Sequence, residues 1–173
     1  MHPVIAPLAA IYELNTDLLV NCLEGLTEEE VRHRLAGGGN SIAFLAAHLA
    51  DTRHFAAARL GHPLPNPLTR YLADARTIDE IETLPPSAQI RGAWLAIADH
   101  LCSALDRLGE AELARQQVHR FPLADSTVVG FVAFLAQHES YHVGQAAFLR
   151  RQLGKPAMAY TRGSGRSAPT AAS

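Results

Sequence analysis

Four long stretches of this sequence repeat apolar residues every three or four positions, a spacing that places them on one face of an α-helix. The stretches are residues 3–23, 41–60, 87–108 and 126–153, and a glycine follows each of them within two residues. Glycine commonly follows the last turn of a helix, so these positions mark helix ends. Four amphipathic helices of similar length predict an all-α fold built as a four-helix bundle.

The connections between these helices are expected to hold only short helical segments. Thr27 and Glu30 have the spacing of a capping box, which predicts a short helix over residues 28–35. Three prolines in residues 61–68 exclude regular structure there, and a second short helix is expected within residues 68–75. No stretch has the alternating pattern of a β-strand.

Length and composition limit the classes of protein to which this chain can belong. Its 173 residues fit one domain, expected over residues 1–160, with a mobile Gly-, Ser- and Ala-rich tail over residues 161–173. The formal charge of -2 gives no basic field for nucleic acid or acidic lipid. No stretch is long and apolar enough to span a bilayer, and the start lacks the features of a signal peptide, so a cytoplasmic protein is expected.

Three polar side chains interrupt the middle of the apolar stripe of the last helix. Between Leu135 and Leu149 the stripe positions are occupied by His138, His142 and Gln145. Burying a polar group without a partner costs on the order of 1–3 kcal/mol, so three in succession need a common reason. Two histidines at i and i+4 project from the same face of a helix and can chelate one metal ion.

A third histidine lies at the centre of the inward stripe of the second long helix. His48 lies between Phe44 and Phe55 on that stripe, near the middle of its helix. A single core histidine more often makes a local hydrogen bond than binds a metal, but a two-histidine chelate on another inward stripe reverses this balance. We therefore predict one divalent ion held by His48, His138 and His142, with the open coordination positions of a catalytic site.

The other six histidines are expected to be solvated or hydrogen-bonded locally. They lie off the inward stripes, in connections or near the start of the chain: His2, His33, His54, His62, His100 and His119. Only His100, which flanks the stripe of the third long helix, is a candidate for a fourth group at the site.

Two other kinds of metal site match part of this pattern. The string HESYH, residues 138–142, has the HExxH spacing of zinc metalloproteases, but that family needs a third ligand downstream, and residues 143–173 contain no Asp, Glu or His. A ferritin-like di-iron site would use an ExxH pair such as Glu139 with His142, but it also needs inward glutamates from two further helices. The inward stripes of the first and third long helices are apolar apart from Asn15, so this alternative is weak.

Five more residues are candidates for roles around the site. Glu139 could act as a base, or it could accept a hydrogen bond from the ring nitrogen of a ligand histidine that does not bind the metal. Gln145 could hydrogen-bond a ligand or the substrate. Asp51 is a further candidate for supporting a ligand, although a solvated surface charge is an equally good interpretation of Asp51 and of Glu139. Trp94 and Tyr141 could line a pocket, but a tryptophan on a helical stripe is more often part of the core.

Two segments of the chain resemble a known family. NSIAFLAAHLADT (residues 40–52), with a histidine in mid-helix, and HESYHVGQ (residues 138–145) resemble the DinB/YfiT-like superfamily, and the resemblance extends over nearly the whole chain. It implies a four-helix bundle, a nickel or zinc ion on His48, His138 and His142, and a homodimer. Some members are thiol-dependent transferases or isomerases that use mycothiol or bacillithiol, others look like hydrolases, and many have no known reaction.

Two functions remain as alternatives. The first is a metal-dependent enzyme that transfers a thiol to a small-molecule substrate, isomerises it or hydrolyses it, with a low-molecular-weight thiol as a candidate cofactor. This function predicts an open coordination position with a pocket beside it. The second is a non-catalytic metal-binding or stress-response module, which predicts a closed coordination sphere and no pocket.

Overall fold

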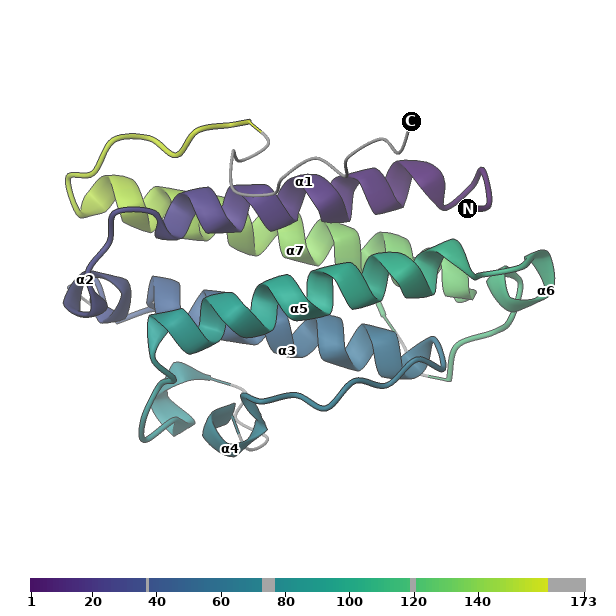
Figure 1. Cartoon of the computed structure of the whole chain (residues 1–173), viewed down its shortest axis with the longest axis horizontal. Helices are drawn as coiled ribbons and strands as arrows, with labels where there is room; N and C mark the ends of the chain where they lie inside the picture. The colour runs from purple at the N-terminus through teal and green to yellow at the C-terminus, as the bar shows by residue number, and fades with distance from the viewer. Residues whose placement is uncertain (37, 73–76, 119–120, 162–173) are drawn as a thin grey trace, which may run out of the picture.

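Four long helices packed lengthwise make up the body of the protein in a computed structural model, which describes residues 1–36, 38–72, 77–118 and 121–161 (Figure 1). The long helices are α1 (Ala6–Leu23), α3 (Ile42–Arg59), α5 (Ser87–Asp106) and α7 (Val128–Gln152). The connections hold α2 (Glu28–Arg32), α4 (Thr69–Leu72), the 3-10 helix η1 (Ile78–Glu80) and α6 (Glu110–Leu113). The described ranges contain no strand, only an isolated bridge between Gln116 and Thr127. The predicted all-α bundle with short extra helices is confirmed.

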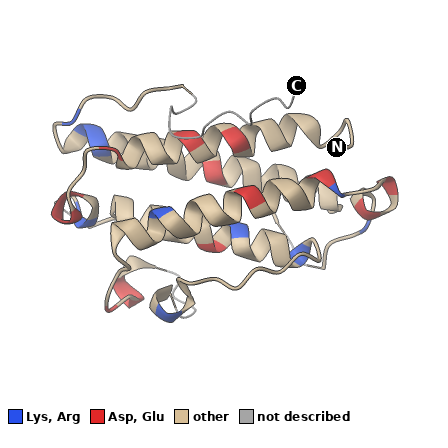
Figure 2. Ribbon diagram, viewed as in Figure 1, with Lys and Arg blue, Asp and Glu red and all other residues tan. Residues whose placement is uncertain are grey.

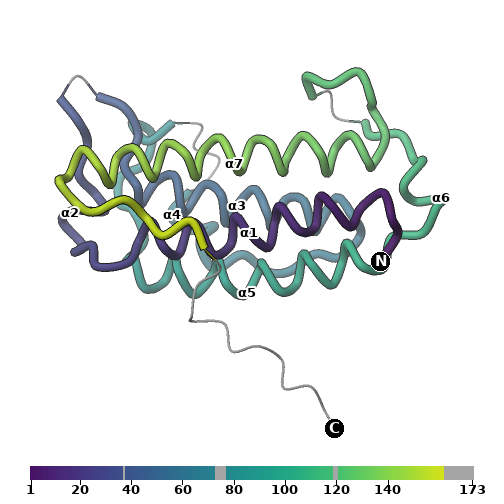
Figure 3. Tube along the Cα trace, turned by 90° about the horizontal axis from the view of Figure 1, so that it is seen from above, coloured from purple at the N-terminus to yellow at the C-terminus, as the bar shows by residue number. Residues whose placement is uncertain are grey.

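The long helices form a ring in which each contacts two neighbours. α1 packs against α5 and α7, and α3 packs against the same two helices. Because α3 and α5 run in the same direction, the chain must return along the bundle between them, and residues 60–72 do so in Figure 1. Figure 3, seen from above, shows that α1 and α7 run parallel to each other and opposite to α3 and α5.

Local sequence explains several helix ends. The Ser41 hydroxyl accepts a hydrogen bond from the backbone N–H three residues on, at 3.2 Å, and caps α3. Thr27 and Glu30 form the predicted capping box of α2. Gly61 and Gly154 follow α3 and α7 with φ of 86° and 75°, left-handed values that glycine adopts without a Cβ clash.

Some predicted ends differ from the structure. The first helix begins at Ala6 rather than at residue 3, and α2 ends at Arg32 because His33 takes an extended ψ of 135°. Gly109 was expected to end the third long helix, but that helix already ends at Asp106. Gly109 has a φ of -89° and precedes α6, where its N–H donates to Glu112 Oε2 at 2.9 Å.

Two predictions fall partly outside the described residues. The short helix expected within residues 68–75 is α4, and its predicted extension past residue 72 lies outside the description. The predicted mobile tail lies outside it from residue 162 onward, whereas Thr161 O accepts a hydrogen bond from Asn21 Nδ2 at 3.0 Å.

A polar layer divides the apolar core into two clusters. One cluster includes Leu45 and Val143, and the other includes Ala57 and Phe131. Between them lie Arg53 of α3 and Glu139 of α7, which are only 1% and 2% exposed. Charged groups are almost never buried this deeply unless they are paired, so this layer needs a structural reason.

The remaining charges show no field of one sign. In Figure 2 the acidic and basic residues are scattered over the helices and loops of the face in view. Among the described helices, none combines the length and the apolar content that a transmembrane segment needs.

Candidate metal centre

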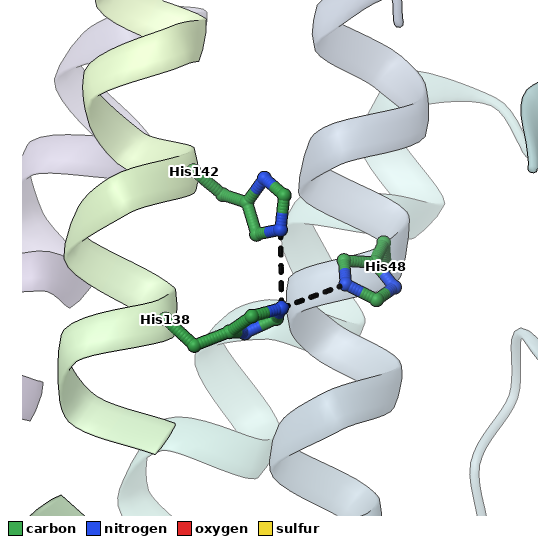
Figure 4. Close-up of side chains that lie close together, drawn as sticks. All are labelled: His48, His138 and His142. Carbon is green, nitrogen blue, oxygen red and sulfur yellow. Dashed lines mark hydrogen bonds between the residues drawn. The ribbon is translucent and has the colours of Figure 1, made fainter. Parts of the chain in front are cut away.

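Three histidines from two neighbouring helices, α3 and α7, point toward one another (Figure 4). The Nε2 atom of His138 lies 3.1 Å from Nε2 of His142 and 3.4 Å from Nε2 of His48. Each of the three residues offers a nitrogen within 4.8 Å of the others. Nitrogens that bind zinc tetrahedrally at about 2.0–2.1 Å lie roughly 3.3–3.4 Å from one another, so this separation fits one shared ion.

Helix geometry and aromatic neighbours hold the three imidazoles in place. His138 and His142 are one turn apart on α7, and α3 passes them with His48 at the same level. Each imidazole has an aromatic ring beside it: Phe44 lies 6.0 Å from His48, Phe134 lies 6.2 Å from His138, and Tyr141 lies 5.2 Å from His142, between ring centroids. Each imidazole is thus flanked by an aromatic side chain as well as by the other histidines.

Burial keeps two of the three imidazoles neutral. It lowers the pKa of His48 from 6.5 to about 4, with smaller contributions from His142 and His138. Burial and, to a lesser degree, His142 also lower the pKa of His138. A neutral imidazole has a free lone pair, so near pH 7 both side chains can bind a cation without first losing a proton.

The metal-free protein should lose stability as the pH falls from about 6.5 toward about 4. In this window the unfolded chain has protonated His48 and the folded chain has not, so the unfolded state binds more protons and acid favours it. Between about pH 7.5 and about pH 5 the free energy of unfolding should fall by about 2 kcal/mol more in the native chain than in His48→Gln. Urea denaturation at the two pH values measures this difference, and equal falls would contradict the low pKa of His48.

Gln145 is hydrogen-bonded to one of the three histidines. Its Oε1 accepts a hydrogen bond from Nδ1–H of His142 at 2.7 Å. In the neutral ring this leaves Nε2 of His142 unprotonated and directed at the other histidines. His138 differs, because its Nδ1 is buried without a hydrogen-bond partner among the described residues. Nε2 of His138 faces the Nε2 atoms of His48 and His142, so it is the nitrogen that a shared metal ion would bind.

Loss of the Gln145 acceptor should weaken metal binding. In Gln145→Leu the affinity for a divalent ion is expected to fall about 10–100-fold, because the ring of His142 is no longer oriented and its basicity drops. Gln145→Glu keeps an acceptor at the same place and should retain more of the affinity. Competition with a chromophoric chelator measures both constants, and equal affinities for Gln145→Leu and the native chain would show that the hydrogen bond has no role in binding.

Glu139 lies in the core and has partners other than the histidines. Arg53 donates from Nε to Oε2 of Glu139 at 2.7 Å and from Nη2 to Oε1 at 2.6 Å, a two-pronged ion pair. Glu139 follows His138 directly, and the turn of about 100° per residue carries its side chain to the inner face of α7. The arrangement therefore differs from both roles considered for Glu139, a base at the metal and a support for a ligand.

Arg53 is the main structural residue that inspection of the sequence missed. Its Nη1 donates to the Thr16 hydroxyl and its Nη2 to the carbonyl of Tyr12, both at 2.8 Å. Its guanidinium carbon lies 3.7 Å from the ring centroid of Trp94, within cation–π range. Arg53, Glu139 and their partners thus connect all four long helices at the level of the histidines.

Three other candidate residues have partners outside the histidine cluster. Asp51 accepts a hydrogen bond from Asn66 Nδ2 at 2.7 Å. His100 pairs through Nε2 with the carbonyl oxygen of His62 at 2.8 Å, as expected for a locally hydrogen-bonded histidine, and it is not part of the three-histidine group. Trp94 is fully buried beneath Arg53 and belongs to the core, whereas the exposed Tyr141 flanks His142.

Comparison with known proteins agrees with this architecture. No curated protein matches the chain significantly. Among solved structures, the crystal structure of a conserved protein from Enterococcus faecalis is similar, with a TM-score of 0.72, 19% identity, and coverage of 90% of this chain and 100% of that one, which shows a shared fold. The family model of the DinB superfamily matches residues 11–146, a range that includes His48, His138 and His142. The chain therefore belongs to the DinB superfamily.

Proposed function

We propose that this protein is a metal-dependent enzyme in which His48, His138 and His142 hold one divalent ion, nickel or zinc, that activates a small nucleophile. The observation that carries this proposal is the convergence of three imidazole nitrogens with no Asp, Glu or Cys among the group in the described residues. Three protein ligands leave coordination positions for a reactant, whereas structural sites use four. A second observation in favour is a cavity that borders the site at Gln145, which the non-catalytic alternative does not require.

The donor set favours reactions of small anionic nucleophiles. Neutral imidazoles leave the double positive charge of an ion uncompensated, and the adjacent carboxylate of Glu139 is already paired with Arg53. A divalent ion in this setting is a Lewis acid that lowers the pKa of water or of a thiol. The site therefore suits transfer of a low-molecular-weight thiol to an electrophile, isomerisation through a thiol adduct, or hydrolysis of a small substrate.

A reaction panel on zinc- and nickel-loaded protein tests this function. Thiols including bacillithiol, mycothiol and glutathione are combined with aryl halides, epoxides and activated esters, and esters are also tested in water alone. Turnover should require the metal, disappear after chelation and be lost in His142→Ala, while the matched control His54→Ala keeps it. If no member of the panel reacts in a metal-dependent way, the non-catalytic module becomes the better description.

A further inference from the structure

A cavity of about 270 Å³ lies between the loop that precedes α3 and the last turns of α7. Its walls include the side chains of Leu35, Leu45, Phe148 and Leu149, with residues 38–40 and Gln145 completing the lining. Among the described residues no Asp, Glu, Lys or Arg lines this cavity, although Arg34 donates a hydrogen bond to the carbonyl of the lining residue Gly39. Phe148 is 57% exposed, so the cavity is not sealed from solvent on its side.

The cavity shares a wall with the metal centre. Gln145 lines it, and the same side chain accepts the hydrogen bond from His142. Leu45 precedes His48 by three residues in α3, and Gln145 follows His142 by three residues in α7. Because α3 and α7 run in opposite directions in Figure 1, Leu45 and Gln145 both lie on the same side of the histidines along the bundle axis. Three helical residues rise about 4.5 Å, so the lining residues Leu45 and Gln145 lie about one turn along their helices from His48 and His142.

We propose that this cavity binds the non-reacting part of the substrate, and that this part is an uncharged, mainly apolar group. The inference rests on the proposed function, since it places the reacting atom of the substrate at His48, His138 and His142. An apolar cavity of about 150 Å³ can hold a benzene molecule, so this cavity has room for a group of at least that size. It is therefore suited to a short alkyl chain or a single ring.

The lining also defines what the cavity rejects. A carboxylate or ammonium group among the apolar side chains of the lining would lose part of its hydration, and the nearby guanidinium of Arg34 is already paired with Asp79. Each methylene group that enters should increase affinity about fourfold. The first few atoms of a chain only bridge the space between the metal centre and the cavity and should contribute less.

A series of hydroxamates tests the cavity on zinc-loaded protein. Hydroxamates chelate zinc through two oxygens, so acetohydroxamate reports the metal centre alone, and butyro-, hexano- and benzohydroxamate add tails that reach the cavity. Calorimetric affinities should rise about fourfold per carbon once the tail passes about three carbons. A tail of matched length that ends in a carboxylate should lose this gain, and metal-free protein should bind none of the series.

Two matched variants test whether the gain in affinity from longer tails comes from this cavity. Leu35→Trp fills the cavity and should abolish the gain from longer tails while leaving acetohydroxamate affinity unchanged. Leu14→Trp, in a separate cavity between α1 and α7, should leave the whole series unchanged. If circular dichroism shows that Leu35→Trp is unfolded, Leu149→Phe takes its place in the experiment, because it fills the same cavity from α7.

Three outcomes would overturn the proposal, and they are distinguishable. Equal affinities of acetohydroxamate and hexanohydroxamate, or a gain that survives in folded Leu35→Trp, would show that the tail does not enter the cavity while leaving the metal centre intact. Stronger binding of the carboxylate tail than of the alkyl tail would refute an uncharged substrate group. If zinc-loaded protein binds no acetohydroxamate, the open metal centre and the proposed function fail together with the inference.

Discussion

Glu139→Ala should lower the free energy of unfolding by about 3–5 kcal/mol, because it leaves the buried guanidinium of Arg53 without its counter-charge. Both side chains are almost fully buried, and the two hydrogen bonds between them are 2.6 and 2.7 Å long. The other acceptors of Arg53 are the Thr16 hydroxyl and the Tyr12 carbonyl, which carry no charge. Urea denaturation measures the change, and Glu29→Ala, at an exposed position in α2, should alter stability by no more than about 0.5 kcal/mol.

A double variant distinguishes loss of the ion pair from a general loss of packing. Arg53→Met combined with Glu139→Leu removes both charges and fills much of the same volume with apolar atoms, so its stability should exceed that of Glu139→Ala. If Glu139→Ala loses less than about 1 kcal/mol, the pair does not stabilise the bundle as described. If the double variant is less stable than Glu139→Ala, an unpaired buried charge is not the cause of the loss.

Alanine at any one of His48, His138 and His142 should reduce metal affinity by about 10²–10³-fold. Apparent binding of about 10–16 kcal/mol at four-ligand zinc sites corresponds to roughly 3–4 kcal/mol for each ligand. His48→Ala is the most informative variant, because His138 and His142 alone would still form an i, i+4 chelate on α7. Chelator competition gives the three constants under one set of conditions.

Two histidines provide matched controls for this series. His54→Ala and His100→Ala remove imidazoles that are hydrogen-bonded to the carbonyls of Leu64 and His62, outside the cluster. Both variants should keep the affinity of the native chain. An undiminished affinity in His48→Ala would reduce the site to the two histidines of α7, and a large loss in His100→Ala would mean that the metal lies elsewhere.

The four helices and the three histidines could be predicted because each leaves a signal within a single helix. Periodicity and the glycines after the last turns gave the four helices to within a few residues. His138 and His142 stood out because they replace apolar residues on an inward stripe. His48 could be added because its position near the middle of its helix suggested a similar depth in the bundle.

The ion pair was missed because it depends on how two helices lie against each other. Arg53 and Glu139 each have the appearance of a charge on the flank of a helix when its sequence is read alone. Their pairing requires the rotation and axial register of α3 against α7, which helical periodicity does not specify. The stripe of buried alanines at 46, 50 and 57 includes Arg53, and this interruption was the available signal.

The hydrogen-bond partner of His100 could not be predicted for a related reason. Its partner is a backbone carbonyl of His62, in the proline-rich connection that runs back along the bundle. Irregular segments have no periodicity from which their path can be derived, so contacts made by their backbone are not visible in the sequence. Phe55 of α3 was also misplaced, since it was assigned to an inward stripe yet is 42% exposed and contacts Phe131 through its ring.

X-ray absorption at the metal edge of the zinc-loaded native protein tests the three-histidine centre most directly. One ion per chain should show three imidazole nitrogens at about 2.0–2.1 Å and at least one further light ligand that is not from the protein. The same spectrum of His48→Ala, at a metal concentration that restores occupancy, should show two imidazoles. A native protein that takes up no stoichiometric metal, or whose metal has fewer than three imidazole ligands, would contradict a centre formed by His48, His138 and His142.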